Sequence, residues 1–212
     1  MPDLKRSSPR REPKRRFILF CEGKNTEPEY FDAVKRACVN ALIEVEIIRA
    51  VGVPYTIAER AGERARSEGL ARNSRRQMNS FEETDQVWAV FDVDEHPRFN
   101  DALLHCKQTG VRVARSNPCF ELWLILHEQE YDRYETRQDM QKQLERIRLD
   151  YAKDRGKTPD CDDMVTRVEK AEHRAEVQLK RRIDADDPFG NPSTTAGRLT
   201  YEIRKADKSA AR

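Results

Sequence analysis

Short apolar runs alternate with longer amphipathic segments along the first two thirds of the chain. Four runs are rich in Val, Ile and Phe and have the length of a strand: 16–21, 43–51, 86–94 and 111–116. The letters "FILF" and "VWAVF" in the first and third runs are continuously apolar. Such runs are typical of central strands in a parallel sheet, which are buried on both faces.

Helix-like segments separate these runs, at about 26–41, 55–78 and 99–109. Thr26 and Pro28 suit the first turn of the first segment, and Gly110 ends the third. The resulting order, β-α-β-α-β-α-β, predicts an α/β fold with a doubly wound, mainly parallel, Rossmann-like sheet.

The stretch "SNPCFELWLILHE" after the fourth run is apolar almost all round, so it predicts a buried helix. In this interpretation Ser116 or Asn117 caps the helix and Pro118 takes its first position. Further helices with charged faces are expected at about 137–149, 160–184 and 194–206. We therefore expect a basic flexible tail (1–15), an α/β catalytic-type core (16–130), and a helical extension that packs on the core or on a partner (131–212).

Composition and charge narrow the class of protein. Charged and apolar residues each make up 37% of the 212 residues, and the formal net charge is only +2. The basic N-terminal tail either holds phosphates of a nucleic acid or only keeps the chain soluble. Five scattered cysteines without a CxxC pair favour free thiols, and no apolar run approaches the ~20 residues of a membrane span. We expect a cytoplasmic protein with no membrane segment.

Acidic residues end two of the expected strands. Glu22 and Gly23 follow the first, and Asp92 and Asp94 end the third. Two residues apart on a strand, the aspartates point to the same side. Ligands of open parallel sheets bind beyond the carboxyl ends of the strands, and hard cations such as Mg²⁺ take oxygen ligands. If the two strands are neighbours, Glu22, Asp92 and Asp94 form a metal site; otherwise they are unrelated loop and cap residues.

Four segments carry a resemblance to a known family. A Glu after the first strand and a DxD after a later one resemble the Toprim fold of topoisomerases, primases and the nucleases of the overcoming-lysogenization-defect class. More closely, "CEGKNTEPEYF", "FDVDEH", "SNPCFELWLILH" and "NPSTT" resemble the signature segments of the RloB-like family, over residues 21–195. The resemblance implies a Toprim-like protein of bacterial restriction and phage-defence loci, often paired with an ATPase partner, RloA.

The Toprim pattern also implies residue roles. Glu22 would be a general acid/base or a metal ligand, and Asp92 and Asp94 would hold Mg²⁺ or Mn²⁺ for phosphodiester hydrolysis. Gly23 would let the backbone approach a phosphate, since it has no Cβ.

Other polar residues keep two interpretations. Lys24 binds a phosphate oxygen or is an exposed turn lysine, and Thr26 belongs to an anion site at the helix N-terminus or simply caps it. His96 assists proton transfer beside the phosphate or is a loop residue, and the neighbouring Glu95 is a candidate outer ligand. Asn117 is a cap or a polar residue of the site.

Glu121 lies in the first turn of an apolar helix, where a carboxylate without a partner is costly to bury. It therefore either faces the helix N-terminus and an arginine such as Arg115, or reaches the metal crevice as a catalytic residue. His127, Trp123 and Phe120 are expected in the core.

The sequence lacks GxxxxGK[ST] and GxGxxG, which speaks against ATP hydrolysis by a P-loop and against dinucleotide binding. The leading hypothesis is a Mg²⁺-dependent nuclease that cleaves RNA or DNA in antiphage defence, with an ATPase partner. A non-catalytic regulatory or binding subunit of an ATPase complex, and a nucleotide-transfer enzyme, remain the alternatives.

Overall fold

The computed structural model describes residues 15–39, 43–50, 52–71, 85–93, 98–152, 156 and 158–209. The elements follow one another as β1 (Arg15–Cys21), α1 (Thr26–Ala37), β2 (Ile43–Arg49), α2 (Pro54–Ser67), β3 (Gln86–Asp92), α3 (Phe99–Thr109), β4 (Arg112–Asn117), α4 (Glu121–Glu128), α5 (Arg137–Ile147), α6 (Cys161–Val165), α7 (Val168–Asp184), β5 (Ser193–Thr194) and α8 (Ala196–Ser209). The expected α/β fold with a doubly wound, mainly parallel sheet is confirmed.

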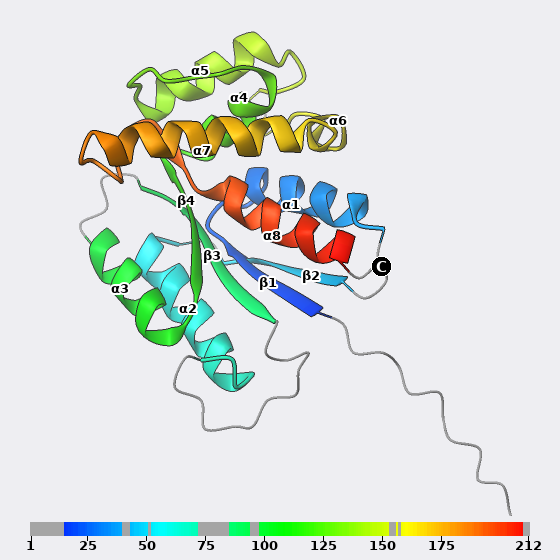
Figure 1. Ribbon diagram of the computed structural model, residues 1–212, viewed down its shortest axis with the longest axis vertical. Helices are drawn as coiled ribbons and strands as arrows, with labels where there is room; N and C mark the ends of the chain where they lie inside the picture. The colour runs from blue at the N-terminus through cyan, green and yellow to red at the C-terminus, as the bar shows by residue number, and fades with distance from the viewer. Residues whose placement is uncertain are drawn as a thin grey trace, which may run out of the picture.

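The sheet has the strand order β2-β1-β3-β4-β5 (Figure 1). β1 pairs in parallel with β2 on one side and with β3 on the other, and β3 pairs in parallel with β4. The short β5 is antiparallel to β4, with Ser116 opposite Thr194. β1 and β3 are therefore the central strands, and their side chains are buried almost throughout.

Helices cover both faces of the sheet (Figure 1). The chain crosses from β1 to β2 in one direction and from β2 through β3 to β4 in the other, so right-handed crossovers place α1 on one face and α2 and α3 on the opposite face. Successive residues of a strand point to opposite faces of the sheet, so they contribute alternately to two hydrophobic cores, one on each face. Phe17 and Leu19 of β1 pack on the α1 side, whereas Ile18 and Phe20 pack against α2 and α3.

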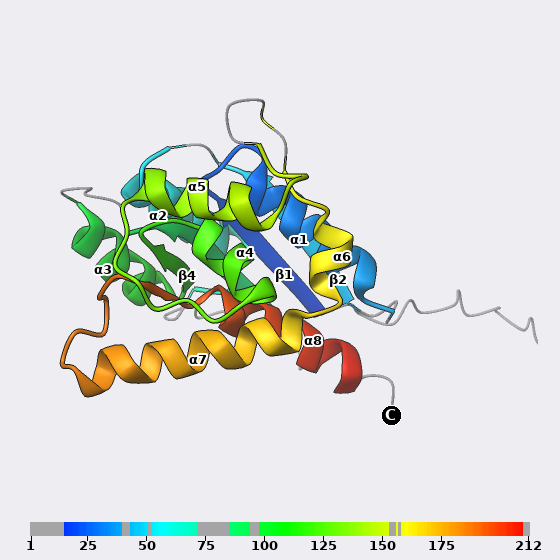
Figure 2. The same cartoon turned by 90° about the horizontal axis from the view of Figure 1, so that it is seen from above.

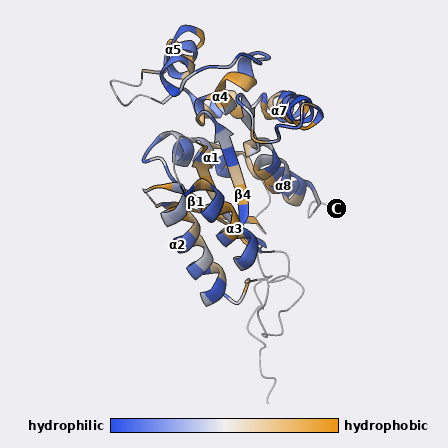
Figure 3. Ribbon diagram, turned by 90° about the vertical axis from the view of Figure 1, so that its left-hand side faces the viewer, coloured by the Kyte–Doolittle hydropathy of each residue, from blue (hydrophilic) through white to orange (hydrophobic). Residues whose placement is uncertain are grey.

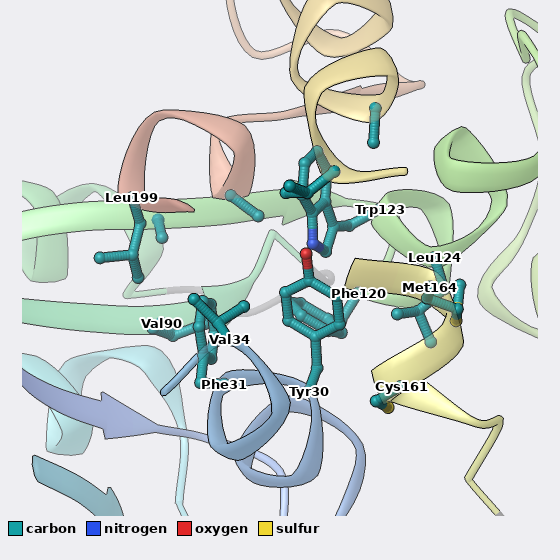
Figure 4. Packing of buried hydrophobic residues seen from close by; sticks show 14 of the residues in the cluster. Tyr30, Phe31, Val34, Val90, Phe120, Trp123, Leu124, Cys161, Met164 and Leu199 are labelled. Carbon is teal, nitrogen blue, oxygen red and sulfur yellow. The ribbon is translucent and has the colours of Figure 1, made fainter. Parts of the chain in front are cut away.

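α4 is the most apolar helix and is buried over most of its length, as expected (Figure 3). Figure 4 shows Tyr30 of α1 pointing toward Trp123 of α4, with their ring centroids 6.0 Å apart in an edge-on arrangement. Both side chains are fully buried, and Phe120 lies beside them. This aromatic contact fixes α4 against α1, beyond the end of the sheet.

The helices after α4 cover it from outside. α5 and α7 pack on α4, and α8 packs on α7 and β4 (Figures 1 and 2). Arg148 and Arg167 share the carboxylate of Glu128, at 3.2 and 2.8 Å, and both also bind Asp163. This network joins the end of α4 to α6 and to the start of α7.

Several element boundaries differ from the expected ones. Asn117 belongs to β4 and α4 begins at Glu121, so the interpretation of Ser116 or Asn117 as a cap with Pro118 in the first turn is wrong. The segment expected as one helix at 160–184 is divided into α6 and α7. The Thr166 hydroxyl donates to the Asp163 carbonyl there at 2.6 Å, a local bond that competes with the helical ladder.

Two general features of the chain agree with the sequence analysis. All five cysteines are free. No helix in the described part of the chain is long and apolar enough to cross a membrane.

Candidate functional site

β1 and β3 are neighbours in the sheet, with β2 beyond β1 and β4 beyond β3, so the strand order reverses between the carboxyl ends of β1 and β3. In open α/β sheets this switch point is where ligands bind. A cavity of about 250 Å³ opens there. It is lined by residues of the loop after β1 and of α1, β3, α4, α5 and the segment that follows α5: Gly23, Lys24, Asn25, Thr26, Glu27, Asp92, Phe120, Glu121, Arg137, Gln141, Tyr151, Gly156 and Thr158. We call this cavity the acidic crevice.

Glu22 and Asp92 meet at the edge of the acidic crevice. The backbone N–H of Glu22 continues the β1–β3 ladder by donating to the Val90 carbonyl at 3.0 Å. Oε2 of Glu22 then accepts a hydrogen bond of 2.9 Å from the N–H of Asp92. The Glu22 side chain thus lies against the end of β3, beside the crevice, while Asp92 is part of the crevice wall.

Gly23 makes room for a second carboxylate, that of Glu27 in the first turn of α1. The N–H of Gly23 donates to Oε1 of Glu27 at 3.2 Å, and a Cβ on Gly23 would overlap this carboxylate. Glu27 is buried. In the described structure, the lack of a side chain at Gly23 therefore serves the packing of Glu27 against the loop.

Glu121 enters the crevice from the first turn of α4. Its Oε1 accepts hydrogen bonds from Nε2 of Gln141 at 3.1 Å and from the hydroxyl of Tyr151 at 2.9 Å. Arg115 lies elsewhere: its guanidinium donates to Ser193 Oγ and to the Pro188 carbonyl. Of the two interpretations left open for Glu121, the structure places it in the crevice.

Arg137 supplies positive charge from the first turn of α5. Its Nη2 atom lies 2.8 Å from Oδ2 of Asp92, and the Asp92 side chain is only 9% exposed. Burial nevertheless raises the pKa of Asp92 well above its ordinary value, with Glu27, Glu121 and Glu22 adding to the rise and Arg137 opposing it. The single positive charge of Arg137 does not balance the negative charges of the carboxylates gathered around Asp92.

The same imbalance affects Glu27. Burial, followed by the charges of Glu121 and Glu22, raises the pKa of Glu27 to about 7. Four carboxylates therefore influence one another at this edge of the sheet: Glu22, Glu27, Asp92 and Glu121. A shortage of positive charge among buried acids is the electrostatic condition that a bound cation relieves.

The donor chemistry fits a hard cation. Glu22 and Asp92 offer carboxylate oxygens at adjacent strand ends, and Mg²⁺ needs only one or two carboxylates because it keeps several waters. Within the described residues, no three His, Cys, Asp or Glu side chains are arranged so that they could hold a metal ion. The third predicted ligand, Asp94, lies outside these residues, as do Glu95 and His96.

The remaining predicted site residues are divided between the crevice and other places. Lys24 and Thr26 line the crevice with Gly23, and Thr26 is the first residue of α1. Asn25, at the N-cap position of α1, makes no side-chain capping hydrogen bond, and it lines the crevice as well. Asn117 is not among the crevice residues; its Nδ2 donates to the Phe189 carbonyl at 2.7 Å.

Sequence reasoning missed several crevice residues, among them the four whose side chains bind or neighbour its carboxylates: Glu27, Arg137, Gln141 and Tyr151. An acid in the first turn of a helix is common, because it faces the positive end of the helix dipole, so Glu27 carries no distinctive signal. Arg137 and Gln141 belong to a helix whose charged pattern resembles a solvated face. Their spacing of four residues, which places both on one side of α5, was the available clue.

Comparison with known proteins adds one match. No curated protein and no solved structure matches the chain significantly. A family model described as RloB-like protein matches residues 17–203, which covers the acidic crevice, the sheet except the first two residues of β1, and all but the last residues of α8. The chain therefore belongs to the RloB-like protein family.

Proposed function

We propose that this protein is a nuclease that uses Mg²⁺ or Mn²⁺ to hydrolyse phosphodiester bonds in RNA or DNA. The observation that carries the proposal is the meeting of Glu22 and Asp92 at the switch point, beside a crevice with too little positive charge for its carboxylates. A hard cation and a phosphate together suit such a place, because the cation neutralises the acids and the phosphate brings negative charge to the cation.

Each side of the crevice has its own task in this proposal. Asp92 and Glu22 would hold a divalent cation, which would neutralise charge on the phosphate and activate a water. The N–H groups at the start of α1, together with Lys24 and Arg137, bind and orient phosphate oxygens. Gln141 and Tyr151 hold the Glu121 carboxylate in a fixed position in the crevice wall. From this position the carboxylate can accept a proton as a general base.

The biological setting is part of the same proposal. The resemblance to the RloB-like family supports a role in bacterial antiphage defence, in the cytoplasm, with an ATPase of the RloA kind as partner. The helices after α4 offer the surface for such a partner, because their outer faces are strongly charged.

The test is a cleavage assay with purified protein on tRNA, mRNA, plasmid and single-stranded DNA, with Mg²⁺ or Mn²⁺ and with and without the ATPase. Glu22→Gln and Asp92→Asn are expected to abolish cleavage without changing the melting temperature. Glu176→Gln and Asp162→Asn are matched controls, since these residues lie in exposed ion pairs with Arg198 and Arg36. Undiminished cleavage by the Asp92→Asn protein would overturn the proposal.

One observation favours a second candidate, a binding or regulatory subunit that cuts nothing. The guanidinium of Arg137 already forms an ion pair with Oδ2 of Asp92. In a protein that binds no metal, this arginine would permanently take the place of the cation. This candidate predicts an ATPase complex that survives loss of the acids and no metal at Asp92. An anomalous-scattering signal beside Glu22 and Asp92 in crystals soaked with Mn²⁺ would decide in favour of the nuclease.

A further inference from the structure

The ion pair between Arg137 and Asp92 joins the proposed cation site to a helix outside the parallel part of the sheet. Asp92 ends β3, whereas Arg137 opens α5, which packs mainly on α4. The Arg137 side chain is 34% exposed and the Asp92 side chain 9%. Arg137 therefore reaches the buried carboxylate from a position with room to move toward solvent.

α5 presents a second polar residue to the crevice, one turn after Arg137. Gln141 is only 7% exposed and donates through Nε2 to Glu121 at 3.1 Å. Its Oε1 atom accepts no hydrogen bond from the described part of the chain. This acceptor is therefore available to a group that enters the crevice with a positive charge or a hydrogen-bond donor, and such a group would offset the cost of burying it.

The surroundings of Arg137 suit a phosphate as well as a carboxylate. The first residue of α1, Thr26, lines the same cavity as Lys24 and Arg137, so the positive end of this helix and two basic side chains are gathered around one space. A guanidinium matches the geometry of carboxylate and phosphate equally well, because it offers a planar fork of N–H donors to either.

On the basis of the proposed function, we propose that Arg137 competes with the divalent cation for Asp92 and, once the cation holds Asp92, binds a phosphate group of the substrate. Without a cation, Arg137 pairs with Asp92 and blocks the cation site. With a cation bound, Arg137 is released from Asp92 and contacts the phosphate. Cation binding and phosphate binding become coupled through one side chain, and a nucleic acid is held tightly only in the cation-loaded crevice.

Two binding measurements on the full chain test this exchange. In the first, Mn²⁺ is titrated without nucleic acid and the free ion is followed by electron paramagnetic resonance. Arg137→Ala and Arg137→Gln are expected to bind Mn²⁺ roughly three- to tenfold more tightly, because the competing ion pair is gone. Lys142→Ala is the matched control, because it also removes one positive charge from α5, but from an exposed ion pair with Asp139. This variant should bind Mn²⁺ with nearly the wild-type affinity.

The second measurement follows the binding of fluorescently labelled tRNA and single-stranded DNA, with Ca²⁺ and with chelator. Arg137→Ala and Arg137→Gln are expected to weaken binding in Ca²⁺ and to leave it unchanged in chelator, with partial rescue by Arg137→Lys. A residue with a purely structural role would not strengthen cation binding while weakening cation-dependent nucleic-acid binding. The melting temperature of each cation-free variant shows that the fold is retained.

The outcomes separate this inference from the proposed function. Equal or weaker Mn²⁺ binding by both neutral variants overturns the inference, even if the wild-type protein cleaves nucleic acid. Unchanged nucleic-acid binding in Ca²⁺ also overturns it. Tighter Mn²⁺ binding with weaker nucleic-acid binding supports it, even if the wild-type protein cleaves nothing, in which case only the nuclease proposal fails.

Discussion

The carboxylate of Glu22 accepts a hydrogen bond of 2.9 Å from the backbone N–H of Asp92, which is 70 residues away in the sequence. This bond closes the β1–β3 ladder at the edge of the acidic crevice. It gives Glu22 a structural task in addition to the role proposed for it in cation binding. The two tasks can be distinguished, because the hydrogen bond needs an oxygen acceptor but no charge.

Glu22→Ala should destabilise the protein, whereas Glu22→Gln should not. The alanine variant leaves the N–H of the buried Asp92 without its acceptor, at a cost of about 1–3 kcal/mol in the free energy of unfolding. The glutamine variant keeps an acceptor oxygen at the same position. Urea-induced unfolding of the three proteins measures the difference; equal stability of the two variants would show that the hydrogen bond contributes little.

Gly23→Ala should destabilise the protein because the new Cβ overlaps the Glu27 carboxylate. We expect a loss of about 1–3 kcal/mol, as for an overpacked core position. In a Glu27→Ala background the same substitution should cost much less, since the overlapping atoms are gone. Gly52→Ala is a control, because its Cβ would lie at 3.3 Å from Thr56. A double-mutant cycle without coupling would contradict the packing role of Gly23.

His127 should make the protein less stable in mild acid. Nδ1 of His127 faces the Trp123 carbonyl at 2.9 Å and therefore carries the proton, so Nε2 accepts from the Tyr30 hydroxyl at 3.0 Å. Burial lowers the pKa of His127 to about 4, and the nearby Arg167, Arg174 and Arg148 act in the same direction.

The sign follows from proton uptake on unfolding. Between the unfolded pKa near ~6.5 and the folded value, the unfolded chain binds a proton that the native protein does not, so stability falls as the pH falls. The contribution of His127 should cost about 2 kcal/mol between pH 7.5 and pH 5. Urea unfolding of wild-type and His127→Gln proteins at both pH values isolates it, because other groups titrate alike in both; a constant difference between the two proteins would contradict the prediction.

Thr195→Val should destabilise the sheet without affecting the crevice. Oγ1 of Thr195 accepts a hydrogen bond of 2.9 Å from the backbone N–H of Arg115 in β4, and Val offers no acceptor for this buried group. We expect a loss of about 1–3 kcal/mol, and Thr195→Ser should restore most of it. Mn²⁺ affinity should stay the same in both variants. A changed affinity would mean that the "NPSTT" segment serves the site as well as the sheet.

Local patterns were sufficient for the strands and most helices of the core. The apolar runs that predicted the first four strands, and the helix at 99–109 with Gly110 after it, are found in the structure. These elements depend on periodicity and end signals within a few residues. β5 was missed because two residues are too short for a period, and the start of α4 was misplaced because β4 continues through Asn117.

The site was predictable only in part, for a different reason. The sequence showed that acids follow the first and third strands, but their proximity depended on the strand order, which places β3 directly beside β1. The placement of Asp94 and His96 is still a prediction, as are the metal and the reaction. Glu27 was hidden because an acid in the first turn of a helix has an ordinary explanation.

The sequence by itself determined the four parallel strands, most of the helices between them, the burial of α4, and that carboxylates stand at the carboxyl ends of two strands. The tertiary structure alone decided that Arg137, Gln141 and Tyr151 meet Asp92 and Glu121 in one crevice. The hydrophobic period of a strand or helix involves only a few consecutive residues, so it can be recognised in the local sequence. Contacts between β3 and α5 bridge 45 residues and arise from the packing of whole helices, which leaves no local pattern to read.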